Sequence, residues 1–65
     1  MNTNTGESLI SVGEAANRLG LSEHTIRKYV QVRSIPFVKI GARVLFAPRD
    51  LDQFVEDRRF KAVDR

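Results

Sequence analysis

Basic side chains gather in the middle of this 65-residue chain. Seven Lys and Arg residues lie between positions 18 and 49 beside one acidic residue, whereas four basic and seven acidic residues share the other positions. The middle therefore carries +6 and the rest −3, which gives the net charge of +3. A basic segment between acidic ends is typical of a surface that binds a polyanion. A solvated surface without a partner explains the charge equally well, so the elements that position these residues must decide.

A helix is predicted over residues 12–19. Ser11 and Glu14 have the spacing of a capping box, in which each side chain bonds the backbone amide of the other residue. Apolar residues then recur at the i, i+3, i+4 and i+7 positions of one helical face, namely Val12, Ala15, Ala16 and Leu19. Gly20 suits the left-handed position that ends a helix. The two alanines allow a second helix to approach this face closely.

A second helix is predicted over residues 23–33, with Ser22 as its N-cap. Ile26 and Val30 share one face of this helix, and Tyr29 lies beside them. Only Gly20-Leu21-Ser22 joins the two helices, which is typical of a helix-turn-helix. Because the connection is short, the helices must cross at a steep angle. That crossing leaves the polar face of the second helix free to enter a groove.

A β-hairpin is predicted after Pro36, which cannot continue a helix. Residues 37–40 and 43–46 are rich in β-branched and aromatic types and flank a Gly41-Ala42 turn. The face that we expect to point inward consists of Val38, Ile40, Val44 and Phe46. The outward face then consists of Phe37, Lys39, Arg43 and Leu45. A register shifted by one residue would reverse all of these side chains, and the sequence leaves both arrangements open.

A third helix is predicted over residues 49–59, after Pro48, with Leu51, Phe54 and Val55 facing inward. The expected fold is thus mainly α with a small β-hairpin. It is a winged helix-turn-helix in the order helix, helix, hairpin wing, helix. We expect this domain over residues 9–60, between a flexible tail at residues 1–8 and a second tail at residues 61–65.

The composition argues against an enzyme, a cofactor or a metal site. A chain of 65 residues supports only a small core, and without cysteine it has no thiolate chemistry. The lone histidine, His24, has no second ligand for zinc, and the carboxylates of residues 50–57 are expected on a solvated helix face. No apolar run approaches the roughly 20 residues that span a bilayer, and residues 1–8 have no secretory pattern. We therefore expect a cytoplasmic, nucleoid-associated protein of a bacterial or phage-infected cell, with no membrane partner.

Double-stranded DNA is the expected partner, because its major groove is about 12 Å wide and admits one helix. Arginine matches guanine O6 and N7 with its planar fork, and the amides that begin a helix can hold a phosphate. The DNA contacts expected from the second helix are Ser22, Glu23, His24, Thr25, Arg27, Lys28 and Gln31. Those expected from the hairpin are Lys39, Gly41 and Arg43. The alternative for the helix is a solvated face with weak local ion pairs, and the alternative for the hairpin is a turn that is basic only for solubility.

Two further roles depend on side-chain direction. Glu23 has a carboxylate that suits a cytosine amino group. Phe37 and Leu45, if both point outward, form an apolar spot that could contact a neighbouring protein.

Five segments follow one another at characteristic distances along residues 10–55. They are Ser11-Val12-Gly13-Glu14-Ala15-Ala16, Leu19-Gly20-Leu21-Ser22, Thr25-Ile26-Arg27-Lys28-Tyr29, Ile35-Pro36-Phe37-Val38-Lys39-Ile40-Gly41 and Pro48-Arg49-Asp50-Leu51-Asp52-Gln53-Phe54. Together they resemble the excisionase-type winged helix-turn-helix family, which is related to the DNA-binding domain of MerR-type regulators. The resemblance implies that the second helix enters the major groove and that the wing contacts the backbone or the minor groove.

The resemblance also implies two functions. One is an excisionase, or recombination directionality factor, which binds and bends DNA to help an integrase excise a mobile element. The other is a small MerR-like transcription regulator. MerR-type regulators carry a long dimerising helix and an effector domain after the winged module, and we expect neither here, which favours the excisionase. We then expect an integrase and neighbouring copies on DNA as partners, and a monomer in free solution. A protein-interaction module of the same fold is the alternative from another class.

Overall fold

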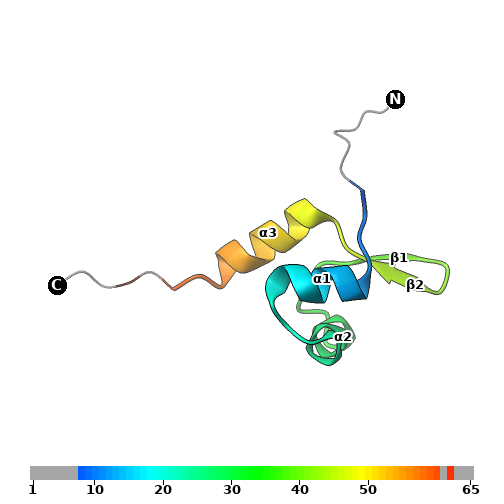
Figure 1. The fold of residues 1–65 in the computed structure, drawn as a ribbon, viewed down its shortest axis with the longest axis horizontal. Coiled ribbons are helices and arrows are strands. Elements are labelled where there is room, and N and C mark those ends of the chain that lie inside the picture. The colour runs from blue at the N-terminus through cyan, green and yellow to red at the C-terminus, as the bar shows by residue number, and fades with distance from the viewer. Residues whose placement is uncertain (1–7, 61, 63–65) are drawn as a thin grey trace.

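The computed structural model describes residues 8–60 and 62, which form three helices and a two-stranded antiparallel sheet. The elements are α1 (Val12–Leu19), α2 (Glu23–Gln31), β1 (Val38–Ile40), β2 (Arg43–Leu45) and α3 (Pro48–Asp57). Figure 1 shows α1 between α2 and α3, with the hairpin extending away from the helices. The predicted winged helix-turn-helix, with its hairpin between the second and third helices, is confirmed. Most of the two predicted tails, residues 1–7, 61 and 63–65, lies outside the described residues.

Both ends of α1 are as predicted. The Glu14 amide donates to Ser11 Oγ at 3.1 Å, and the Ser11 amide donates to Glu14 Oε1 at 3.3 Å, which is the capping box. Gly20 has a φ of +71° and ends the helix. The Gly20 amide donates to the Asn17 carbonyl and the Leu21 amide to the Ala16 carbonyl. These two bonds make a Schellman motif and satisfy carbonyls that have no partner within the helix.

Helix α2 begins as predicted but ends at Gln31, two residues before the predicted end. The Ser22 hydroxyl accepts from the Thr25 amide at 3.1 Å, which confirms the N-cap. At the other end Arg33 has a φ of +57°, and its amide donates to the Val30 carbonyl. The Ser34 amide donates to the Tyr29 carbonyl, so this end is also a Schellman motif. The predicted end of α2 was wrong because the left-handed position after the helix, which is usually a glycine, is occupied by Arg33.

The hairpin has the predicted turn, but the predicted direction of its first strand is wrong. Lys39 pairs with Val44 and Ile40 with Arg43, so each pair shares one face of the sheet. Val44 and Phe37 pack against the core, whereas Ile40 is 55% exposed. The second strand therefore points as predicted, and the first is reversed by one residue. Successive side chains of a strand alternate between the two faces of the sheet. This alternation determines which side chains share a face, but not which face is buried.

Helix α3 begins at Pro48, one residue before the predicted start, and proline suits a first helical position because its missing amide has no helical partner there. The Arg58 and Arg59 amides bond to carbonyls three residues earlier, so the α-helix ends at Asp57 rather than at residue 59. The Arg58 guanidinium carbon lies 3.8 Å from the Phe54 ring centre, and Nη2 donates to the Ser34 carbonyl at 3.1 Å. Arg58 thus ties the end of α3 to the turn that follows α2.

The buried core consists of Ala15, Ala16, Ile26, Ile35, Phe46, Leu51 and Phe54. The alanines allow α1 to lie close to its neighbours, as predicted. Phe46 is completely buried, and its backbone exchanges two hydrogen bonds with Ile10, which joins the residues just before α1 to the base of the wing. The prediction for Val55 was wrong, since it is 41% exposed, and Ile35 enters the core from a loop. None of the helices within residues 8–60 has the length and apolar character required to cross a membrane.

Candidate nucleic-acid interface

The outer face of α2 is polar and exposed because its inner face is used for packing. Ile26 is completely buried, and Tyr29 contacts the Phe54 ring edge-on with 5.7 Å between the ring centres. A helix repeats every 3.6 residues, so a face opposite these side chains must meet solvent. The residues exposed along that helix are Glu23, His24, Arg27, Lys28 and Gln31.

A hollow of about 300 Å³ separates α2 from the wing. Its rim on the α2 side is formed by His24, Arg27, Lys28 and Gln31. Its other lining residues are apolar, namely Val12, Val30 and Val44. Residues from α2 and from β2 therefore border the same concave surface. Four of the contacts predicted for α2 thus face one space, which Val44 of the wing also borders.

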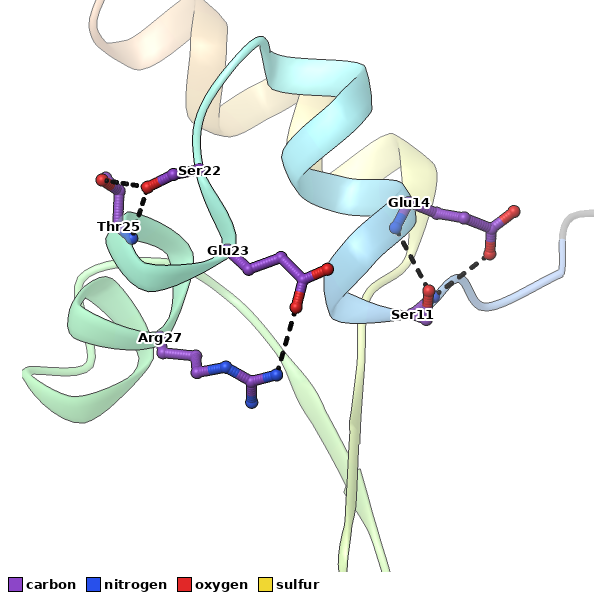
Figure 2. Close-up of polar contacts among 6 residues, drawn as sticks. All are labelled: Ser11, Glu14, Ser22, Glu23, Thr25 and Arg27. Atoms are coloured by element: carbon purple, nitrogen blue, oxygen red, sulfur yellow. Dashed lines mark hydrogen bonds and ion pairs between the residues drawn. The ribbon is translucent and has the colours of Figure 1, made fainter.

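The start of α2 is held by a local hydrogen-bond network. Ser22 Oγ lies 3.0 Å from Thr25 Oγ1 and also accepts from the Thr25 amide (Figure 2). Ser22 is exposed, and its position at the positive end of the helix suits a nearby phosphate. Thr25 is half-buried, so its bonds to Ser22 stabilise the start of the helix.

Glu23 and Arg27 are neighbours one turn apart on α2. Arg27 Nη2 donates to Glu23 Oε1 at 3.3 Å, with 65% of the Arg27 side chain and 56% of the Glu23 side chain exposed (Figure 2). An exposed pair at this spacing contributes only a few tenths of a kcal/mol, or about 0.3–0.5, to stability. The main effect of the pair is on the direction of the two side chains. The Glu23 carboxylate, which was expected to accept from a cytosine, accepts from Arg27 instead.

The wing divides its two basic residues between the faces of the sheet. Lys39 shares a face with Val44, which lines the hollow, so the strand reversal moves Lys39 to the side of α2. Arg43 lies on the opposite face with Ile40, beside the turn. Gly41 at the turn is exposed, has a φ of +61° and has open space where a Cβ would stand. The turn can therefore approach a partner without a steric barrier.

The expected apolar spot of Phe37 and Leu45 does not form. Phe37 packs against the core, and Leu45 is half-buried on the opposite face, where it pairs with Val38. Phe37 points inward because the first strand is reversed relative to the prediction. Conversely, the sequence did not indicate that Val12, Val30 and Val44 would border the hollow, because only the packing of three elements brings them there.

Carboxylates of α3 have partners on the helical surface. Arg18 Nη2 donates to Asp52 at 3.4 Å, Gln53 Nε2 donates to Asp57 at 2.8 Å, and Arg59 Nε lies 3.2 Å from Glu56. Within the described ranges, no group of three or more His, Cys, Asp or Glu side chains is placed to hold a metal ion. Asp52 and Glu56 thus pair with Arg18 of α1 and with Arg59 just after α3, and Asp57 accepts from a neutral amide.

A family model described as a helix-turn-helix domain matches residues 9–59. The chain belongs to the helix-turn-helix domain family. No curated protein and no solved structure gives a significant match. The matched residues contain α1, α2, the hairpin and α3, so the family covers the whole of the fold described above.

This membership supports DNA binding. In a helix-turn-helix domain the second helix is the recognition helix, and its N-terminal residues contact base edges in the major groove. Here α2 is the second helix, and its exposed face carries Arg27 and Lys28. The described side chains therefore place positive charge on the element that the family uses to read DNA.

Proposed function

We propose that the helix-turn-helix domain binds double-stranded DNA at specific sequences, with α2 in the major groove and the wing against the backbone. The observation that carries the proposal is the hollow bordered by exposed His24, Arg27, Lys28 and Gln31 on one side and by the wing on the other. The predicted contacts Ser22, Glu23, Thr25, Lys39, Gly41 and Arg43 complete the proposed interface.

Arg27 and Arg43 have different proposed tasks. Arg27 lies on the outer face of α2 and reads a base, so Arg27→Ala should weaken binding to the preferred site by about 1–3 kcal/mol, or about 5- to 150-fold. Arg43 lies at the wing turn and contacts a phosphate, which carries no sequence information. Arg43→Ala should therefore weaken binding to all sequences and reduce the slope of log affinity against log salt by about 0.9.

The experiment begins with selection of a preferred site from random duplexes, followed by titration of that site and of a scrambled duplex at several salt concentrations. Arg59→Ala is the matched control, since it removes the same charge from a residue that pairs with Glu56 after the end of α3. We expect this control to retain the selectivity of the natural chain. Salt-insensitive binding would refute the proposed contact with DNA phosphates. Binding by Arg27→Ala with undiminished selectivity would refute the assignment of α2 as the recognition helix.

The further proposal is that the protein acts as an excisionase, or recombination directionality factor, in DNA recombination of a mobile element. Its support is the resemblance of residues 10–55 to the excisionase-type family. On this proposal the protein bends DNA, lines up with neighbouring copies, and assists an integrase, although it is a monomer in free solution.

Footprinting on DNA from around the gene tests this role. Several adjacent protected sites, filled cooperatively and with a bend, support the excisionase. One protected site that overlaps a promoter supports a MerR-like transcription regulator instead. A stable dimer at micromolar concentration in sedimentation would also count against the excisionase.

A further inference from the structure

The carboxylate of Glu23 lies between two helices. It belongs to the first residue of α2, and its Oε1 accepts from Arg27 on the same helix at 3.3 Å. Its Oε2 faces the first turn of α1, where it lies 3.0 Å from the place that a Cβ on Gly13 would occupy. Figure 2 shows the Glu23 side chain reaching towards α1 while its other oxygen meets Arg27.

Gly13 is not required by the backbone at its position. It is the second residue of α1 and, unlike Gly20 and Gly41, it has no positive φ. A glycine within a helix is destabilising relative to alanine, because it loses more backbone freedom on folding. A Cβ at Gly13 would press on Glu23 Oε2 at a distance that ordinary contacts rarely reach. The missing side chain therefore leaves space for the Glu23 carboxylate.

The same place is electrostatically favourable for a carboxylate. The first turn of α1 is the positive end of that helix. The Arg27 guanidinium provides a second positive group on the other side of Glu23. Arg27 therefore lies on one side of the Glu23 carboxylate and the first turn of α1 on the other.

We infer that Glu23 is a positioning residue that fixes the guanidinium of Arg27 for base recognition, and that Gly13 makes this possible. One bond from Nη2 to Glu23 leaves other donors of the planar fork free for a base. The inference rests on the proposed function, since it assigns the source of selectivity within the same interface. Glu23 then acts through Arg27 instead of contacting cytosine.

Two variants test the inference by the ratio of affinities for the selected site and for sites with single base pairs replaced. Glu23→Gln keeps the size of the side chain but removes its charge, and it should lower the ratio by about twofold at the base pair read by Arg27, as expected for an exposed ion pair at this spacing. Glu56→Gln is the control, because Glu56 forms a comparable pair with Arg59 on α3. It should leave the ratio unchanged.

Gly13→Ala separates positioning from folding. Alanine favours a helix, so the melting temperature should stay equal or rise. The new Cβ requires Glu23 Oε2 to move by a few tenths of an ångström, so selectivity should fall in the same direction as in Glu23→Gln but by less. A variant that is as stable as the natural chain and less selective is an outcome that a purely structural role for Gly13 does not produce.

The Arg27→Ala background completes the test. There Glu23→Gln should have no further effect on selectivity. An equal effect in both backgrounds would mean that Glu23 contacts the base itself, and no effect in the natural chain would also overturn the inference. If Arg27→Ala keeps full selectivity, the proposed function of α2 fails rather than the positioning role alone.

Discussion

Ile26→Val removes one methylene from the middle of the core. Ile26 is completely buried on the inner face of α2. Loss of a buried methylene costs about 0.8 kcal/mol in transfer free energy, and measured Ile→Val changes in cores cost about 0.5–1.5 kcal/mol with the cavity included. We expect a loss of about 1 kcal/mol in the free energy of unfolding, which lowers the melting temperature of a domain this small by about 4–8 °C.

Ile40→Val makes the same chemical change at the wing and is the matched control. Ile40 is 55% exposed, so less than half of its methylene burial is at stake. Scaling the transfer free energy by the buried share gives at most about 0.4 kcal/mol. Its melting temperature should therefore fall by no more than about 3 °C.

Thermal and urea unfolding followed by circular dichroism measure both variants, since small single domains usually unfold in one cooperative step. The sequence pattern of the hairpin placed Ile40 in the core, and the structure places it outside. An Ile40→Val loss equal to that of Ile26→Val would therefore refute the observed strand register. A negligible loss for Ile26→Val would refute the burial of α2 against α1.

Two more changes test the local contacts around α2. Ser22→Ala removes the N-cap bond to the Thr25 amide and should destabilise the domain by about 1 kcal/mol, as urea unfolding would show. Arg58→Ala removes both the contact over the Phe54 ring and the bond to the Ser34 carbonyl. Arg58→Ala should lower the free energy of unfolding by about 1 kcal/mol, since an exposed cation–π contact contributes about 0.5–1 kcal/mol. Equal losses for Arg58→Ala and Arg59→Ala would show that these contacts contribute nothing.

Local hydrogen bonds made much of the fold predictable. Ser11 and Ser22 bond amides three residues away, and Gly20 and Gly41 take positive φ values at the ends they were expected to mark. Such bonds and turns depend on neighbours in sequence, so residue types and spacing suffice to predict them. Where the local signal was missing, as for the left-handed Arg33, the predicted helix end was wrong.

The candidate site was predictable in part. The order of helices and the exposed polar face of α2 followed from apolar spacing, which placed Arg27 and Lys28 outside the core. The orientation of the two hairpin strands relative to that helix did not follow from the sequence. A strand alternates strictly, so the pattern leaves two opposite orientations, and Lys39 was assigned to the wrong one.

The sequence by itself determined the starts of α1 and α2, the turn of the wing and the charge of the middle segment, because each arises from residue types or from contacts within a few residues. Only the tertiary structure decided which face of β1 is buried, which side chains border the hollow, and that Glu23 lies against Gly13. Those features join elements that are distant along the chain. Their geometry depends on how α1, α2 and the wing pack together, and no short-range pattern of residues specifies that packing.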